Sequence, residues 1–179
     1  MIYLFLADGF EEVEALTPVD MIRRCEIDIA TVGVGNQSVM GSHGIPVLAN
    51  ITDNDIVLDD SLDMIILPGG MPGTLNLEKN KNVQRAIDFC AKNGRYIAAI
   101  CAAPSILGHK GLLEGKKAVC YPGFEEQLQG AKVGTEPVCV DGKIITSRGA
   151  GTAMPFAFEL VKLLTSKERS EKLKSSVIY

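Results

Sequence analysis

Short apolar runs alternate with helical segments along most of this chain, and this alternation limits the folds that it can adopt. The predicted strands are Ile2–Ala7, Asp28–Val34, Met64–Leu67, Tyr96–Ile100 and Lys117–Cys120. The predicted helices are Glu11–Arg24, Asn82–Lys92, Ala103–Lys110 and Ala153–Leu164. Strands that alternate with helices form a mostly parallel sheet covered by helices on both faces. The sequence therefore predicts one α/β domain over residues 1–179.

Turn and break signals refine this pattern. Pro18 falls inside the first predicted helix and predicts a kink or an early end there. Residues 38–49 contain two glycines and are expected to form a short β-excursion. Asp141-Gly142, between two apolar runs, predicts a hairpin. The charged segment from Ser166 onward is expected to be partly helical.

Composition narrows the classes of function. The formal net charge of −4 and the absence of Trp argue against nucleic acid or an anionic membrane as the main partner. The five cysteines form no CxxC pair, which favours reduced thiols over a disulfide framework. No apolar run is long enough to cross a bilayer and no leader is recognisable, so we expect a cytoplasmic protein. Neither a nucleotide motif nor zinc-ligand spacing is present, so no cofactor and no metal is predicted.

The segment Tyr96–Leu107 carries the strongest functional signal. It reads as an apolar strand, then Cys101, then small residues that open a helix. A strand-to-helix turn this sharp accepts only small neighbours, and Ala102 and Ala103 are small. Hydrolases present their nucleophilic serine on the same kind of turn. The positive end of the following helix would favour the thiolate and lower the pKa of Cys101. The alternative is an inert cysteine buried at a strand end.

In parallel sheets, functional sites lie at the carboxyl ends of the strands. This rule brings together Ala7-Asp8-Gly9, Pro68-Gly69-Gly70 and Cys101. The backbone N–H groups of Gly70 and Ala102 are candidate donors to a developing oxyanion. The alternative is that the two glycines only provide a tight exit from the strand.

Glu14 is the candidate acid or base. Acidic residues in a first helical turn are commonly explained by the helix dipole, and this accounts for Glu11 and Glu12. Glu14 lies on a helix that must cover the sheet. If Glu14 faces the strand ends, desolvation raises its pKa, and the protonated carboxyl can donate a hydrogen bond to the sulfur of Cys101.

The two histidines are not placed to act as a base for Cys101. His43 lies in the β-excursion, and His109 lies near the end of the helix that follows the cysteine. The sequence therefore gives little support to a Cys-His-Asp triad within one chain.

Four segments together resemble the ThiJ/PfpI superfamily, and within it the Parkinsonism-associated deglycase (glyoxalase III-like) subfamily. They are FLADGFEEVEALTPVDMIRR, DMIILPGGMPG, AAICAAPSIL and ITSRGAGTAMPFAFELV, and they span Phe5 to Val161 in the family order. The resemblance implies a flavodoxin-like three-layer α/β/α sandwich of the class I glutamine amidotransferase type. It also implies a homodimer.

The resemblance also assigns roles to residues. Cys101 matches the reactive cysteine, Glu14 its protonated acidic partner, and Gly70 and Ala102 the backbone donors. His43 falls where relatives carry an arginine that approaches the partner subunit's site. Two further matches, Arg24 and Arg148, are expected to be structural or to lie at the subunit interface.

Two departures from the family pattern bear on activity. Tyr121 stands where the subfamily often has a histidine near the cysteine, so proton transfer would depend on Glu14, with Tyr121 or water as auxiliary. The peptidase branch carries a histidine directly after the nucleophile, where this chain has Ala102.

Three functions remain open from the sequence. The leading hypothesis is a cofactor-independent cysteine enzyme that acts on small reactive aldehydes or glycated substrates through Cys101 and Glu14. The second is a non-enzymatic oxidative-stress sensor or redox chaperone that uses oxidation of Cys101. The third is an intracellular amidase or peptidase, which Ala102 disfavours.

Overall fold

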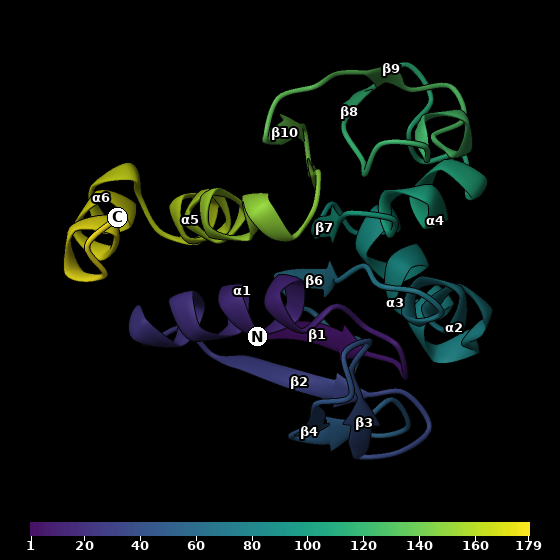
Figure 1. Ribbon diagram of the computed structural model, residues 1–179, viewed down its shortest axis with the longest axis horizontal. Helices are drawn as coiled ribbons and strands as arrows, with labels where there is room; N and C mark the ends of the chain where they lie inside the picture. Colours follow the sequence, from purple (N-terminus) through teal and green to yellow (C-terminus); the bar gives the residue numbers. More distant parts are fainter.

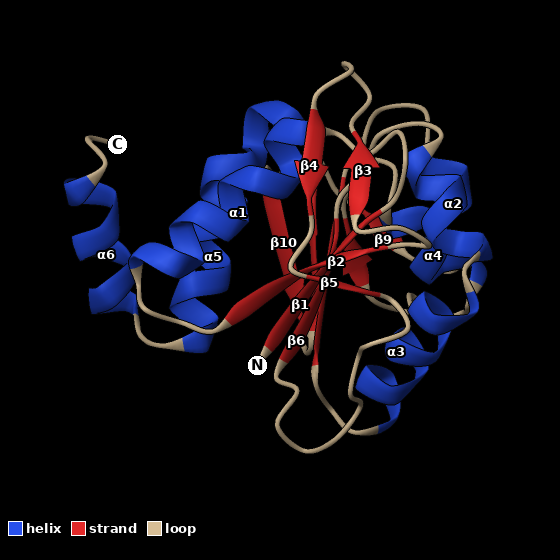
Figure 2. Cartoon of the chain, turned by 90° about the horizontal axis from the view of Figure 1, so that it is seen from below, coloured by secondary structure: helices blue, strands red, loops and turns tan.

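A seven-stranded sheet runs through the molecule between two layers of helices (Figures 1 and 2). The computed structural model describes residues 1–179. In spatial order the strands are β10 (Val138–Asp141), β11 (Ile144–Ser147), β7 (Tyr96–Ile100), β6 (Met64–Leu67), β1 (Ile2–Leu6), β2 (Ile29–Gly33) and β5 (Ile51–Thr52). All neighbouring pairs are parallel except β10 and β11, which form the predicted hairpin. The prediction of a mostly parallel sheet is confirmed.

The helices divide between the two faces of the sheet, as Figure 2 shows. They are α1 (Glu12–Arg24), α2 (Gly73–Lys79), α3 (Lys81–Lys92), α4 (Pro104–His109), α5 (Ala153–Leu164) and α6 (Lys167–Ser176). Side chains alternate along each strand, so β1 places Leu4 and Leu6 in one core with α1 and α5. It places Tyr3 and Phe5 in a second core with α3 and α4. This double burial explains why the central strands are continuously apolar.

Three local expectations need correction. The first helix does not end at Pro18 but continues to Arg24. Helix α2 was not predicted, because it has only seven residues and begins at a glycine. The predicted strand Lys117–Cys120 is shortened to β8 (Lys117–Ala118) and pairs with β9 (Lys132–Val133) outside the main sheet.

The β-excursion forms a separate hairpin of β3 (Ser38–Met40) and β4 (Pro46–Leu48). Its backbone is joined to the loop that precedes α1, where the N–H of Gly9 donates to the carbonyl of Met40 over 2.8 Å. The hairpin therefore lies beside the start of α1.

The topology positions the candidate site. Strands β1, β6 and β7 are adjacent and parallel, so their carboxyl ends meet at one edge of the sheet. The loop into α1, the Pro68-Gly69-Gly70 turn and Cys101 follow these three strands directly. None of the helices is long and apolar enough to span a membrane.

Candidate active site

Cys101 lies on the sharp turn that the sequence predicts. It follows β7 directly, three residues before α4 begins, and its backbone is left-handed with φ 66°. Two hydrogen bonds hold this conformation: the N–H of Cys101 donates to the carbonyl of Ser147, and its carbonyl accepts from the N–H of Tyr121, each over 2.9 Å. A left-handed backbone is unfavourable for a residue with a side chain, so the surrounding structure imposes it.

Glu14 reaches the cysteine from α1. Its side chain is buried, and Oε2 accepts a hydrogen bond from the N–H of Gly69 over 2.9 Å. The carboxyl is also hydrogen-bonded to the thiol of Cys101. Burial raises the pKa of Glu14 to about 7, against the opposing effect of these hydrogen bonds. The expectation of a desolvated Glu14 with a raised pKa is therefore confirmed.

The direction predicted for the Cys101 pKa is wrong. Burial raises the pKa of the thiol to about 12, and the neighbouring Glu14 charge adds to this effect. The backbone N–H groups of Ala102 and Gly70 act in the opposite direction and are outweighed. Helix α4 has only six residues and begins beyond Ala103, so its dipole is too small and too remote to prevail over burial.

The side chains of Glu14 and Cys101 titrate as a coupled pair. Glu14 and Cys101 share a hydrogen bond, so their protons leave in steps that belong to the pair. The first proton leaves near neutral pH, and the second is held to high pH. The pair with one proton can place it on sulfur or on the carboxyl. Donors from Gly70 and Ala102 favour a negative sulfur, and the donor from Gly69 favours a negative carboxylate.

Gly69 is required by the closeness of this pair. A Cβ at position 69 would lie 2.5 Å from Cβ of Cys101 and 2.6 Å from Oε2 of Glu14. Gly70 adopts φ 91°, and a Cβ there would lie 2.4 Å from the backbone N of Glu11. The glycines therefore do more than let the chain leave the strand, since Gly69 leaves room for the side chains of Cys101 and Glu14 to meet.

Tyr121 closes another side of the site. Its side chain is half exposed, and its ring lies against Gly149 in the turn after β11. A Cβ on Gly149 would lie 3.2 Å from Cδ2 of Tyr121 and 3.8 Å from Oε1 of Glu14. The sequence analysis missed Ser147 and Gly149. The rule that sites gather at strand ends would have found them if it had been applied to β11.

His43 pairs with Glu12 and makes no hydrogen bond to Cys101 or Glu14 of its own chain. Its Nδ1 lies 2.9 Å from Oε2 of Glu12, and its backbone N–H donates to Oε1 over 2.8 Å. Burial alone would raise the pKa of Glu12, but these hydrogen bonds outweigh it and hold that pKa at about 2. The hydrogen bond to Glu12 in turn raises the pKa of His43. The helix-dipole account of Glu12 is therefore incomplete, because this carboxylate fastens the hairpin to α1.

Ligand atoms of Glu11, Glu12 and His43 lie within 4.8 Å of one another. They are the one group of side chains with spacing suited to a metal ion. The hydrogen bonds between His43 and Glu12 account for this arrangement without an ion.

The remaining candidate residues lie outside the Cys101–Glu14 pair. His109 bridges Glu78 and Gln127, at 2.6 and 2.7 Å, in agreement with a structural role. Arg24 pairs with Asp20 one turn earlier on α1. Arg148 donates to the carbonyl of Thr135 over 3.3 Å.

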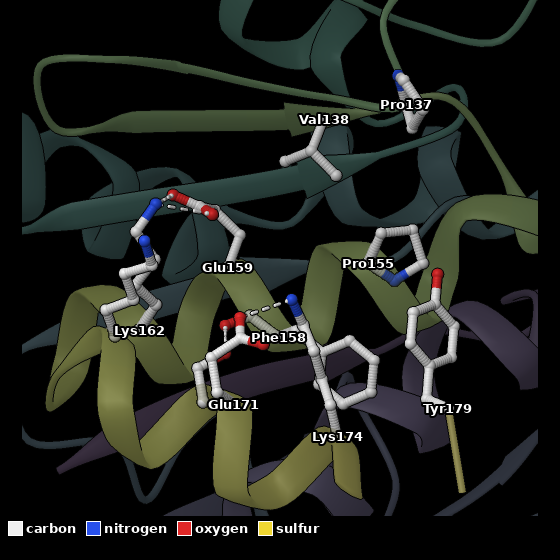
Figure 3. Close-up of a pocket in the computed structure, with 11 residues that line it drawn as sticks. Pro137, Val138, Pro155, Phe158, Glu159, Lys162, Glu171, Lys174 and Tyr179 are labelled. Atoms are coloured by element: carbon white, nitrogen blue, oxygen red, sulfur yellow. Dashed lines mark hydrogen bonds and ion pairs between the residues drawn. The ribbon is translucent and has the colours of Figure 1, made fainter.

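A surface cavity of about 320 Å³ lies between α5, α6 and β10 (Figure 3). It is lined by Phe158, Tyr179 and several lysines and glutamates. Lys174 and Lys162 are paired there with Glu171 and Glu159. Neither Cys101 nor Glu14 lines this cavity, so it is separate from the candidate active site.

An elbow cysteine hydrogen-bonded to a buried glutamate, at the carboxyl edge of a parallel sheet, places the chain among α/β proteins with a cysteine at the strand-to-helix turn. The chain belongs to the DJ-1/PfpI family, whose pattern it matches over residues 1–163. Protein DJ-1 homolog B of Arabidopsis thaliana is 41% identical over 97% of this chain, which spans only 40% of that protein.

Two further relatives cover nearly the whole of both chains. The glutathione-independent glyoxalase DJ-1 of Schizosaccharomyces pombe is 33% identical over 93% of this chain and 92% of that protein. The structure of oxidized DJ-1 from Toxoplasma gondii superposes with a TM-score of 0.94 at 33% identity, covering 99% of this chain and 97% of that one.

Proposed function

We propose that this protein is a cofactor-independent enzyme of the glyoxalase or deglycase type, acting on small reactive carbonyl compounds. The observation that carries the proposal is the hydrogen-bonded pair of Cys101 and Glu14, in which burial brings the pKa of the carboxyl to about 7. An acid or base that titrates near the working pH is the kind that transfers protons efficiently. The name of the Schizosaccharomyces pombe relative supports the same chemistry.

The first half of the reaction forms a covalent intermediate. As the sulfur of Cys101 attacks the aldehyde carbon of an α-oxoaldehyde such as methylglyoxal, the Glu14 carboxylate takes the thiol proton, and the S–C bond forms as the C=O π bond opens. The aldehyde oxygen takes a proton from the carboxyl of Glu14, which gives a hemithioacetal. Hydrogen bonds from the N–H groups of Gly70 and Ala102 favour negative charge on the sulfur, which supports its role as the nucleophile.

The second half moves a proton between two carbons. The Glu14 carboxylate removes the proton from the former aldehyde carbon, giving an enediolate whose negative charge lies on the former ketone oxygen. Glu14 returns this proton to the neighbouring carbon, and the hydroxyl proton on the first carbon passes to the former ketone oxygen. The first carbon is thereby oxidised to a thioester and the ketone is reduced to an alcohol. Water then cleaves the S–C bond and releases a hydroxy acid such as lactate, so no external oxidant or reductant is consumed.

A panel of aldehydes tests the proposal. The wild-type protein is expected to convert methylglyoxal or another α-oxoaldehyde to the hydroxy acid without glutathione, measured by chromatography of the product. Cys101→Ser serves as the blank, because it keeps the fold but lacks the thiol. Equal product formation by the wild type and this variant would exclude Cys101 as the nucleophile.

Redox sensing is the second candidate function. Cys101 is partly exposed, whereas the other four cysteines, Cys25, Cys90, Cys120 and Cys139, are buried. Mild peroxide is therefore expected to add two oxygens at Cys101 before it modifies the other four. Peptide mapping by mass spectrometry gives the order of modification. Equal oxidation of all five cysteines would contradict the sensor function.

We also propose that the protein forms a homodimer through α1, up to its end near Arg24, and through the β3–β4 hairpin near His43. Large apolar side chains are exposed on both elements, namely Val13, Leu16, Met40, Ile45 and Leu48. A two-fold partner would bury the same patch on each subunit and bring His43 toward the partner's site. Light scattering at micromolar concentration is expected to give twice the chain mass of 19.2 kDa. A monomer would exclude both the dimer and this role for His43.

A further inference from the structure

The geometry points to Tyr121 as a specificity-determining residue: its ring forms an apolar wall beside Cys101 that favours α-oxoaldehydes bearing a planar aromatic group. This inference rests on the proposed function and adds a substrate class to it. The first observation is the position of the residue. The backbone N–H of Tyr121 donates a hydrogen bond to the carbonyl of Cys101 over 2.9 Å. This bond fixes the backbone of Tyr121 next to that of the nucleophile.

The second observation is the direction in which the ring packs. The ring edge formed by Cδ2 and Cε2 lies 3.2 and 3.7 Å from the point where a Cβ on Gly149 would stand. The same point is 3.8 Å from Oε1 of Glu14. The Tyr121 ring and the Glu14 carboxyl therefore both lie close to Gly149, and the absence of a side chain at this position leaves room for the ring.

The third observation is that the ring remains available. Tyr121 is 50% exposed, although one edge packs on Gly149. Its hydroxyl makes no hydrogen bond to another protein group, and the ring atoms nearest Gly149 are the carbons Cδ2 and Cε2. A ring held on one side and free on the other offers a ligand a large apolar surface at a small cost in side-chain entropy.

A pair of substrates isolates this effect. Methylglyoxal and phenylglyoxal share the aldehyde that Cys101 attacks and differ in the group on the neighbouring ketone. We compare the ratio of kcat/KM for phenylglyoxal to kcat/KM for methylglyoxal. Because two aromatic rings are in contact only with phenylglyoxal, this ratio is expected to be about tenfold higher with the Tyr121 ring than without it.

The variants separate the ring from the hydroxyl. Tyr121→Phe is expected to keep the wild-type ratio of the two kcat/KM values, and Tyr121→Ala to lower it about tenfold. A ratio unchanged in Tyr121→Ala overturns the inference. Loss of the ratio in Tyr121→Phe also overturns it, because the hydroxyl would then be the recognising group. Circular dichroism checks that each variant is folded.

A second readout does not require turnover. Alkylation of Cys101 by iodoacetamide and by its N-phenyl derivative compares the same leaving group with and without an aromatic ring. Peptide mapping gives the rate of alkylation by the N-phenyl reagent divided by the rate for iodoacetamide, and the same ratio for a free thiol is divided out. The resulting value should fall in Tyr121→Ala and stay at the wild-type level in Tyr121→Phe. If the wild type converts neither aldehyde, the proposed function fails, while this ratio still decides whether the Tyr121 ring binds aromatic groups.

Discussion

Glu14→Gln is expected to reduce turnover of α-oxoaldehydes by about a thousandfold, within the range that general acid–base catalysis contributes. Glutamine keeps the size of the side chain and can still meet the N–H of Gly69 and the thiol of Cys101, but it cannot release or accept a proton. In the wild type, kcat/KM is expected to rise with pH through about 7, where the buried pair loses its first proton. The variant should lose that inflection, and steady-state kinetics between pH 5 and 9 measure both effects.

The stability of the same variant shows whether the fold is intact. The pKa of Glu14 rises from 4.5 to about 7 on folding, so the folded protein binds the proton more tightly than the unfolded chain. The wild type therefore loses stability as the pH rises from 4.5 to about 7, by roughly 3 kcal/mol from this group. Glu14→Gln removes this loss, so its free energy of unfolding at pH 8 should equal or exceed that of the wild type. Asp88→Asn, on α3 at the opposite face of the sheet, is the matched control with unchanged kinetics. Near-wild-type turnover of Glu14→Gln would leave the glutamate with a structural role only.

Gly69→Ala is expected to reduce turnover by about a hundredfold or more, because it forces Cys101 and Glu14 apart. The added methyl carbon would lie 2.5 Å from Cβ of Cys101 and 3.0 Å from its Sγ, distances at which neighbouring atoms must move. The backbone of Gly69 is not left-handed, so the effect comes from crowding of the pair rather than from strain at position 69. Overpacking at this buried point should also cost about 1–3 kcal/mol of stability.

The matched control for this substitution is Gly151→Ala. A Cβ at position 151 meets no atom within 4 Å, and the backbone there is not left-handed. This variant should retain wild-type turnover and stability. If Gly69→Ala keeps full activity while folded, the hydrogen bond between the carboxyl and the sulfur is not needed for the reaction.

The strands and most helices were predictable because their signals are local. Continuous apolar runs identified β6 and β7 with their observed bounds, and the predicted helix Ala153–Leu164 matches α5. The strand-end rule placed Cys101 and Gly70 at one edge, since it depends only on parallel connections. Helix α2 escaped prediction because tertiary packing, rather than propensity, holds so short a helix in place.

The sequence by itself determined the sheet, the elbow and the choice of Cys101 and Glu14 as candidate site residues. These follow from hydrophobic periodicity, from the small residues around Cys101 and from the few acidic groups that can face the strand ends. Only the tertiary structure decided the protonation of that pair. Burial of the thiol outweighs a short helix and raises its pKa, contrary to the expectation from the sequence. It also decided that Tyr121 lies over Gly149 and that Glu12 fastens His43. Desolvation and contact depend on distances between residues far apart in the chain, and those distances exist only once the chain has folded.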